Sequence, residues 1–159
     1  MVDVTTAQVW DEVRKQTFAV VGMVSARGAA RTAGIVYTVD GGRLFYSTVA
    51  EDWKTRHVQA NPSVSVTVLV PKSVPLLPWI KVPPATITFA GTARVLSAGE
   101  APAPIVEKLL HGLDLGGAAA SHHAVVEVTP TGDFVTYGVG VSARGMLDTE
   151  KARGRAPVG

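Results

Sequence analysis

The sequence predicts a mainly antiparallel β fold with a few short helices, in which six or seven strands close, or nearly close, into a barrel. β-Rich runs follow one another in quick succession, and hairpin signals rather than long helical segments separate them, which favours a barrel over a parallel β/α sheet. Residues 63–70 alternate almost perfectly between valine and polar positions, as a strand with one buried face does. With 159 residues, of which 47% are hydrophobic, the chain is expected to form a single domain, residues 1–159.

The first part of the chain predicts a helix followed by three strands. A capping-box pattern begins at Thr5, and an apolar stripe of helical spacing follows it, so residues 1–16 are expected to hold a short N-terminal helix. From residue 17 to residue 48 the composition changes to apolar, β-branched runs. Asp40-Gly41-Gly42 stands between two of these runs and is a strong hairpin signal.

The middle of the chain predicts a small helix, a strand and a long loop. Asp52 can cap a two-turn helix that ends at Ala60, because the Asn-Pro pair that follows disfavours helical geometry. The alternating strand of residues 63–70 comes next. Residues 71–85 carry five of the ten prolines, so they are expected to form a loop, and a loop of this length in a compact domain usually has a function.

The last part of the chain completes the expected barrel. A strand over residues 86–97 precedes a second helix within residues 99–112, and two late strands are expected to join at Pro130-Thr131-Gly132. The barrel is therefore assigned to residues 17–143. Residues 144–159 are expected to be a loose, polar C-terminal tail.

Composition restricts the class of protein. The net charge of +2 comes from dispersed arginines, which is weak support for binding nucleic acid, so none is expected. The chain has no cysteine, which excludes disulfides, thiolate metal sites and a cysteine nucleophile. No apolar run approaches the roughly 18 residues of a membrane helix, so the protein is expected to stay off membranes and in the cytoplasm. Because only 18% of the residues are charged, a partner is expected to cover apolar surface, and a homodimer is the default.

Residues 46–68 hold the pattern that points most directly to chemistry. A strand ends in two hydroxyls, Ser47 and Thr48, and a short helix carrying Trp53 and Lys54 follows at once. The first turn of such a helix offers free N–H groups and the positive end of a dipole, to which Lys54 adds a full charge, so a phosphate could bind there. Lys54 and Arg56 lie about 200° apart around a helix, and Lys54 is the expected ligand. Spacing alone does not establish a site and favours an ordinary surface helix, because basic residues on short helices are common.

No metal site and no catalytic side chain are expected. Of the four histidines, His122 and His123 are adjacent on a strand and should point to opposite faces, and His57 lacks a partner at helical spacing. The serines lack the Gly-x-Ser-x-Gly pattern of a hydrolase elbow. Trp79 lies in an apolar part of the proline-rich loop. It either packs against the barrel or a second subunit, or covers a planar cofactor or substrate bound at the neighbouring subunit.

The run "LFYSTVAEDWKTRHVQANPSVSVTV", preceded by "ARTAGIVYTVDGGR", resembles the pyridoxamine 5'-phosphate oxidase-like family. In this run, an apolar-aromatic strand with Ser/Thr is followed by a short loop and by Lys before a basic pair. Asn-Pro and an alternating strand come next. The resemblance covers residues 17–97, with a looser fit to the end of the chain. It implies the FMN-binding split barrel, a homodimer, and a groove between subunits that holds FMN or, in some branches, an 8-hydroxy-5-deazaflavin coenzyme.

The resemblance also implies roles for individual residues. Phosphate contacts would come from the two hydroxyls and Lys54, with a further contact from Arg31. Backbone near Ile35, Val36 and Tyr37 would lie along the ring, and Trp53 and Trp79 complete the expected cofactor-binding set.

Two departures limit what the resemblance implies. The fuller arginine set of true pyridoxamine phosphate oxidases is not recognisable, and their C-terminal segment is replaced by "GMLDTEKARGRAPVG", which argues against vitamin B6 oxidation. The expected activity is hydride transfer between the cofactor and a small organic substrate, with the redox chemistry carried by the cofactor. A non-catalytic protein that binds a flavin or another planar ligand is the alternative.

Overall fold

The structure is a computed structural model of the chain, and it describes residues 1–74, 79, 81–97, 99–110 and 122–159. Strands dominate it, and the helices are short. The elements in chain order are β1 (Val2–Asp3), α1 (Thr6–Lys15), β2 (Phe18–Val24), β3 (Ala30–Asp40), β4 (Arg43–Val49), α2 (Trp53–Ala60), β5 (Ser63–Val70), β6 (Ala85–Leu96), α3 (Ala103–Leu110), β7 (His123–Tyr137), the 3-10 helix η2 (Gly145–Leu147), α4 (Thr149–Ala152) and β8 (Arg153–Pro157).

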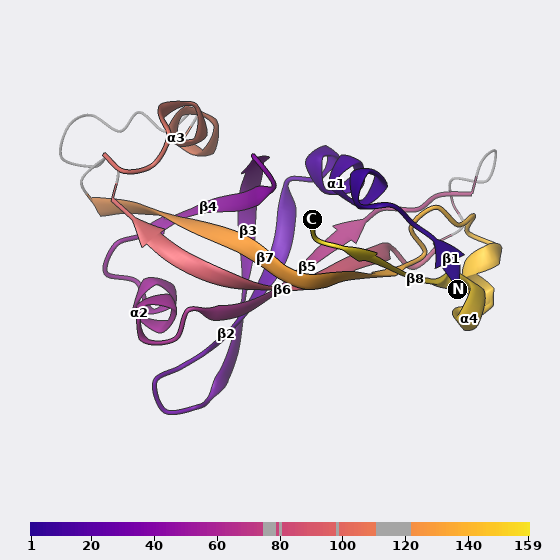
Figure 1. Cartoon of the computed structure of the whole chain (residues 1–159), viewed down its shortest axis with the longest axis horizontal. Coiled ribbons are helices and arrows are strands. Elements are labelled where there is room, and N and C mark those ends of the chain that lie inside the picture. Colours follow the sequence, from indigo (N-terminus) through magenta and orange to yellow (C-terminus); the bar gives the residue numbers. More distant parts are fainter. Residues whose placement is uncertain (75–78, 80, 98, 111–121) are drawn as a thin grey trace.

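Six antiparallel strands form a closed barrel (Figure 1). The strand order is β7-β4-β3-β2-β5-β6, and the pairing of β6 with β7 closes the ring. β8 pairs with the outer half of β7, and β1 pairs with β8 in parallel. The predicted mainly β barrel with short helices is therefore confirmed.

The barrel is split because two long strands change partners along their length. The first half of β3, through Val36, pairs with β2, whereas Tyr37 to Asp40 pair with β4. The first half of β7 pairs with β4, and Asp133 to Tyr137 pair with β8. Gly41 and Gly42 both have positive φ, 53° and 73°, which is the conformation that the tight β3–β4 hairpin requires.

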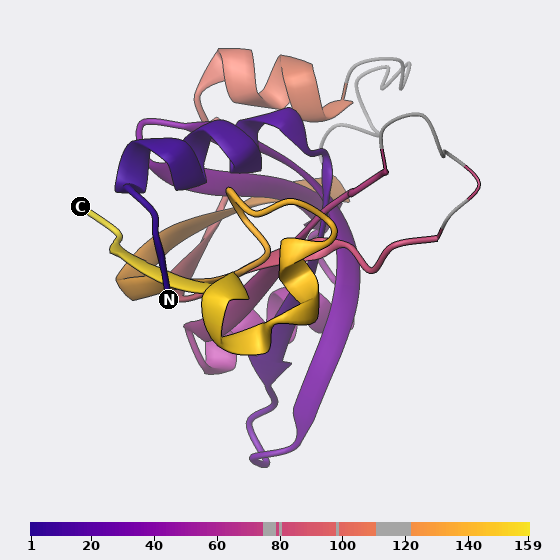
Figure 2. The same ribbon diagram turned by 90° about the vertical axis from the view of Figure 1, so that its right-hand side faces the viewer.

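Helix α1 covers one opening of the barrel (Figures 1 and 2). The predicted capping box is present, because Thr5 accepts from the backbone of Gln8 and the Gln8 side chain accepts from the Thr5 N–H. Trp10 packs edge-on against Phe134 from β7, with ring centroids 5.4 Å apart. Aromatic pairs in this geometry add to the free energy gained by burying their area.

Helix α3 covers a second, smaller apolar cluster on the outside of the barrel. Phe45 from β4, Leu96 from β6 and Val125 from β7 are buried there against Ile105 of the helix. Both faces of β4 are therefore covered near its middle.

The region expected to hold two late strands is a single strand of 15 residues, β7. Pro130-Thr131-Gly132 is not a hairpin turn, since β6 runs beside both halves of β7 and pairs with each. The register shifts between Thr88 and Ala90 opposite Gly132, whose φ is 73°. The turn-like residues therefore mark an irregularity in one long strand rather than its end.

The C-terminal residues 144–159 are ordered rather than loose, which corrects the sequence prediction. They form η2, α4 and β8, and Gly154 and Ala156 are buried on the inward face of β8. A Cβ added at Gly154 would lie 2.7 Å from the Thr136 hydroxyl, so only glycine fits this close approach. The buried positions are small and the exposed ones are two arginines and a proline, which is why hydrophobicity alone did not reveal a strand.

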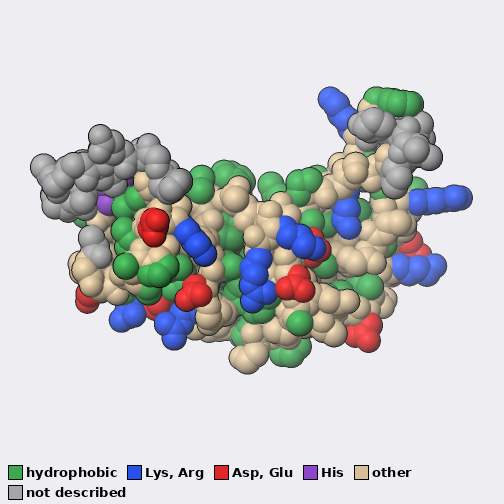
Figure 3. Space-filling view, turned by 90° about the horizontal axis from the view of Figure 1, so that it is seen from above, with side chains coloured by type: hydrophobic (Ala, Val, Ile, Leu, Met, Phe, Trp, Pro, Cys, Tyr) green, Lys and Arg blue, Asp and Glu red, His purple; other side chains and the backbone are tan. Residues whose placement is uncertain are grey.

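Charges of both signs are mixed on the surface over α1 (Figure 3). On this helix Arg14 pairs with Asp11 and Lys15 pairs with Glu12, each one turn apart. Such exposed pairs contribute little to stability. Within the described residues, every helix falls short of the length and hydrophobicity needed to span a bilayer.

Candidate functional site

The predicted phosphate site lies where β4 ends and α2 begins, and this junction is called the corner below. The alternation of β4 turns Thr48 toward the barrel interior, where it is buried, and leaves Ser47 half-buried on the outer face. The two hydroxyls therefore serve opposite sides of the strand, as the alternation predicts. The buried Thr55 of α2 donates to the carbonyl of Val49 over 2.8 Å, which fixes the helix against the end of β4.

Asp52 and Lys54 form an ion pair at the start of α2. Asp52 is the N-cap residue, and its Oδ1 accepts from the N–H of Trp53 over 2.7 Å. Its Oδ2 accepts a hydrogen bond from Nζ of Lys54. The side chain of Lys54 is 23% exposed, whereas Arg56 is exposed, so Lys54 is the cation held close to the first turn of the helix.

Lys54 lowers the pKa of the Asp52 carboxyl below its ordinary value, because the hydrogen bond from the ammonium group favours the charged form. The N–H of Trp53 acts in the same direction. Asp52 is therefore ionised at neutral pH and neutralises Lys54. An anion that binds at this corner must compete with an internal carboxylate for the ammonium group.

Trp53, the first residue of α2, packs against the main core. Its ring meets the His57 ring edge-on, with centroids 5.4 Å apart. Nζ of Lys54 also lies 5.4 Å from the centre of the Trp53 ring, within the range of a cation–π contact. Trp53 thus helps to position Lys54, and much of its own surface is already used in packing.

Two buried hydroxyls on the inward face of β4 have no hydrogen-bond partner among the described residues. They are Oγ1 of Thr48 and Oη of Tyr46. Oγ1 of Thr48 nevertheless lies near enough to the Asp52 carboxylate to help lower the pKa of that group. Burial raises the pKa of the Tyr46 phenol, so the group stays neutral. A buried hydroxyl without a partner is costly unless a ligand or water satisfies it, and Thr48 lies at the strand end nearest α2.

The three predicted ring-contacting residues of β3 point in different directions. Ile35 and Tyr37 are buried inside the barrel, and Oη of Tyr37 donates to the carbonyl of Val13 over 2.6 Å. Val36 faces outward and is 65% exposed. At this part of β3 only Val36 offers a side chain to a ligand outside the barrel, so Ile35 and Tyr37 could contribute there through their backbone alone.

Among the described residues, Arg31 makes no hydrogen bond to the corner. Arg31 is exposed near the start of β3, where it pairs with Met23 of β2, and its guanidinium donates to the carbonyl of Ala30. Trp79 is 73% exposed. The neighbouring residues of its predicted apolar cluster, 76, 77 and 80, lie outside the described residues.

Sequence reasoning missed the role of Asp52 as the counter-ion of Lys54. The spacing of two residues is not one that places side chains on the same helix face, and the pair forms because an N-cap side chain turns back over the first turn. The contact of Thr55 with Val49 was missed as well. A threonine one turn into a helix that follows a strand so closely could have suggested it.

A cavity of about 540 Å³ lies beside the corner, between α2, the end of β6 and the start of β7. Thr55 and Gln59 of α2 line it together with His123 of β7. Nδ1 of His123 is buried, and it has no hydrogen-bond partner within the described part of the chain. Sequence reasoning had set this histidine aside because His122 and His123 were expected to point to opposite faces of a strand.

The closed six-stranded barrel with its changes of strand partner defines the class: it is the FMN-binding split-barrel fold. The family model described as pyridoxamine 5'-phosphate oxidase matches residues 5–132. The chain belongs to the pyridoxamine 5'-phosphate oxidase-like family, as the sequence predicted. A comparison with curated proteins finds no match.

Solved structures of very different sequence share the fold. A Listeria innocua protein described as a candidate pyridoxamine 5'-phosphate oxidase has a TM-score of 0.62 and 18% identity, over 79% of this chain and 92% of that one. An F420 reductase has a TM-score of 0.55 and 17% identity, over 76% and 91%. The heme storage protein HutZ from Vibrio cholerae has a TM-score of 0.62 and 11% identity, over 84% and 94%. The fold is therefore shared by a reductase and by a heme storage protein.

Proposed function

We propose that the protein is a homodimeric oxidoreductase that uses FMN, or alternatively an 8-hydroxy-5-deazaflavin coenzyme, to transfer hydride to or from a small organic substrate. The observation that carries this proposal is the position of Lys54, which is held over the first turn of α2 at the end of the strand that carries Thr48. Family membership supports the same assignment.

The residues at the corner fit the phosphate of such a coenzyme. The first turn of α2 leaves backbone N–H groups without partners inside the helix, and the helix dipole favours negative charge there. Thr48 adds a buried hydroxyl that lies near the Asp52 carboxylate. Lys54 adds an ammonium group, and Ser47 a hydroxyl on the outer face of β4. Amides, hydroxyls and a cation together make a donor set suited to a phosphate.

Each residue then has a distinct task. Lys54 leaves the carboxylate of Asp52 and binds the anion, while Asp52 continues to cap the helix through the N–H of Trp53. Thr55 keeps α2 against β4, so that the corner does not open when the ion pair separates. The coenzyme itself supplies hydride transfer when bound. The protein's part is to bind it, orient it and exclude water.

A strip of exposed apolar side chains supports a dimer. Phe18 of β2 pairs directly with Val36 of β3, and both side chains are exposed on the outer face. Leu69 of β5 is also exposed and follows Val68, which pairs with Ala19 of β2. Three adjacent strands therefore present an apolar strip to solvent, which a second copy of the chain would cover.

Side-by-side titration of the purified, coenzyme-free protein with FMN and with the deazaflavin tests the proposal. We expect saturable binding of one of the two coenzymes with a stoichiometry of one per chain, followed by its reduction or reoxidation when electron donors or acceptors are added. Absence of saturable binding for both coenzymes would refute it. Binding without any turnover would leave the binding role and remove the enzymatic one.

A non-catalytic protein that binds a planar ligand is the second candidate function. His123 favours it, because its buried Nδ1 lacks a partner among the described residues and its side chain lines the cavity beside α2. Histidine is a common ligand of heme iron, and a heme storage protein shares this fold. Titration with hemin separates the candidates. A Soret shift that disappears in His123→Ala, together with no binding of either flavin, would support the second.

A further inference from the structure

An uncharged surface lies beside the corner, on the outer face of β2 and β3. Phe18 is 48% exposed and Val36 is 65% exposed, and the two residues pair across the strands. Residues 18–24 and 32–39 of these strands carry no charged side chain. Exposed apolar side chains that gather on a surface free of charge mark an interaction site, whereas single ones do not. Phe18 and Val36 are together called the platform below.

The Phe18 ring leans across from β2 onto β3. A Cβ added at Gly34 would lie 2.8 Å from Cζ and 2.9 Å from Cε2 of this ring, so the ring occupies the space that a side chain at position 34 would need. A phenylalanine that stood straight out into solvent would not reach the neighbouring strand in this way. The ring therefore lies along the surface and turns one face outward, where a planar group can stack on it.

The platform adjoins the corner through the split in the barrel. Tyr37 and Tyr46 form the last register pair before β3 and β4 separate. Val36 and Ser47 are the next residues on the two strands, and both side chains lie on the outer face. From Ser47 to Phe18 is two strand spacings, about 10 Å. The ribityl chain of a flavin spans such a distance between its phosphate and its ring.

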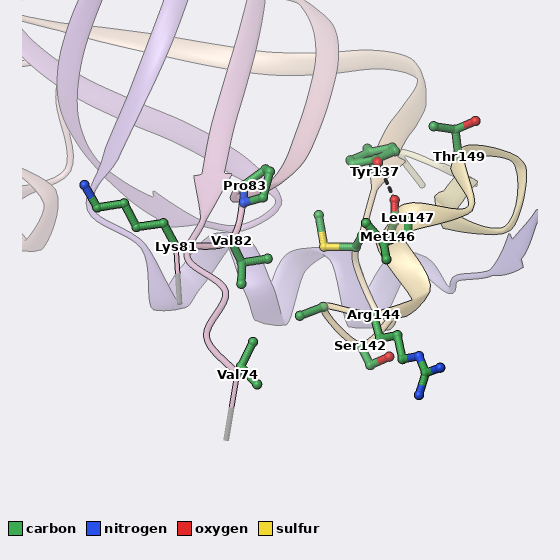
Figure 4. Close-up of a pocket in the computed structure, with 11 residues that line it drawn as sticks. Val74, Lys81, Val82, Pro83, Tyr137, Ser142, Arg144, Met146, Leu147 and Thr149 are labelled. Atoms are coloured by element: carbon green, nitrogen blue, oxygen red, sulfur yellow. Dashed lines mark hydrogen bonds between the residues drawn. The ribbon is translucent and has the colours of Figure 1, made fainter. Parts of the chain in front are cut away.

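A cavity of about 630 Å³ (Figure 4) is too far from the corner to hold the same ring. Figure 4 shows Val82, Tyr137 and Met146 among the residues that line it. Tyr137 is the last residue of β7, whereas His123, which pairs with Val49 beside the corner, is the first. The whole length of β7 separates the two places. A ring joined to a phosphate at the corner can therefore reach the platform but not this cavity.

We infer that the tricyclic ring of the coenzyme lies on the platform, stacked on Phe18 and in contact with Val36, while its phosphate is bound at the corner. The inference rests on the proposed function and names the side chains that hold the ring. FMN and the deazaflavin coenzyme share such a ring, so the platform serves either. Burial of the apolar part of the ring adds to the affinity from the phosphate contacts. The second copy of the chain covers the rest of the strip, including Leu69.

Coenzyme titration of a Phe18 variant tests the inference. Phe18→Leu keeps an apolar side chain at an exposed position and removes the aromatic ring. The affinity for the coenzyme that the wild type binds, FMN or the deazaflavin, should fall roughly three- to tenfold. Val135→Ala is the matched control, because Val135 is 43% exposed on the outer face of β7, away from the platform, and it should leave the affinity unchanged. Unchanged affinity in Phe18→Leu would overturn the inference.

A variant of Gly34 distinguishes stacking from a general loss of apolar surface. Gly34→Ala places a Cβ where the Phe18 ring now lies, so it should displace the ring and weaken coenzyme binding although Phe18 itself is unchanged. In the Phe18→Leu background the same change should have little further effect, because both changes act through one ring. Additive losses would show that Gly34 acts independently of Phe18 and would contradict the position given to the ring.

A tryptophan reporter gives a readout that does not depend on affinity. Tryptophan in contact with a flavin quenches the flavin fluorescence, so the bound coenzyme should emit much less light in Phe18→Trp than in the wild type or in Val135→Trp. Thermal melting should confirm that each variant folds, since both positions are exposed. Equal emission from the three saturated proteins would place the ring elsewhere.

The outcomes separate this inference from the proposed function. A wild-type protein that binds neither coenzyme refutes both. A wild-type protein that binds one of them with the same affinity as Phe18→Leu refutes the role of the platform alone. Sedimentation of Phe18→Leu should show an unchanged mass. A dimer that dissociates in this variant while its coenzyme affinity stays intact would assign Phe18 to the contact with the second copy instead.

Discussion

Asp52 caps the first turn of α2 and, with its second carboxylate oxygen, holds the ammonium group of Lys54. The cation that would meet a coenzyme phosphate is therefore already neutralised by its own helix cap. An incoming phosphate replaces one anionic partner of Lys54 by another, so the coenzyme affinity depends on how strongly Asp52 competes.

Replacing Asp52 should accordingly tighten coenzyme binding. Asp52→Asn keeps a side-chain oxygen that can cap α2, but it removes a negative charge beside the phosphate and frees Lys54. We expect a several-fold gain in affinity for the coenzyme at neutral pH, measured by fluorescence titration and larger at low salt. Glu51→Gln, which removes the adjacent exposed charge, is the matched control and should have a much smaller effect. A loss of affinity in Asp52→Asn would show that Asp52 orients Lys54 rather than competing with the ligand.

Lys54 and Arg56 should differ as coenzyme ligands. Lys54→Ala should lower coenzyme affinity by roughly tenfold or more, because it removes a charge-assisted hydrogen bond at a partly buried position. Arg56 is exposed on the same helix, so Arg56→Ala should change the affinity much less. Equal losses in the two titrations would mean that the phosphate does not lie on the Lys54 side of α2.

The Asp52–Lys54 pair also makes a pH-dependent contribution to stability. The folded-state pKa of Asp52 is lowered, so its contribution is present above its ordinary value of 3.8 and is lost as the pH falls below that value through the lowered pKa. We expect the wild type to be more stable than Asp52→Asn at pH 7, and the difference to shrink below about pH 3.8. Urea unfolding of both proteins between pH 2.5 and 7 measures it. A difference that stays constant over this range would contradict the role given to the ion pair.

Two buried tyrosines on neighbouring strands form a matched pair for testing hydrogen bonds. Oη of Tyr37 donates to the carbonyl of Val13, so Tyr37→Phe leaves that carbonyl without its partner and should cost about 1 kcal/mol in the free energy of unfolding. Oη of Tyr46 has no partner among the described residues, so Tyr46→Phe should be neutral or stabilising. Denaturant unfolding measures both. If Tyr46→Phe proves the more costly change, a bound water or ligand satisfies its hydroxyl in solution.

The outer apolar strip predicts the effect of a charge on assembly. Val36 is 65% exposed, so Val36→Asp should fold normally as a monomer but should shift the protein from dimer to monomer in sedimentation experiments. Leu147→Asp introduces the same charge at an even more exposed apolar residue outside the strip, and it should leave the mass unchanged. A wild-type protein that sediments as a monomer would remove the basis of the proposed dimer.

Local signals predicted many of the elements correctly. Thr5 and Gln8 form the expected capping box, residues 63–70 form the expected half-buried strand, and α2 ends at Ala60 before the Asn-Pro pair. Gly41 and Gly42 make the expected hairpin. These features depend on backbone preferences within a few residues, which a sequence displays directly.

The errors share one cause, which is that a distant strand decided the outcome. Turn-like residues at Pro130 to Gly132 do not end a strand when β6 continues on their other side. The arginine-rich residues 153–157 become β8 because β7 offers a free edge and small residues fit against Thr136. Neither partner is near in sequence, so neither effect is visible in local composition.

For the candidate site, the sequence by itself determined the chemical groups: two hydroxyls, a helix start and a lysine in a fixed order that also identified the family. The tertiary structure alone decided which of them are accessible and which are already paired. It buried Thr48, turned Val36 outward and joined Lys54 to Asp52. It also brought Val74 and residues 81–83 beside the segment after β7, around a cavity. The physical reason is that burial and pairing depend on packing between segments far apart in the chain, whereas residue type and local backbone preference do not.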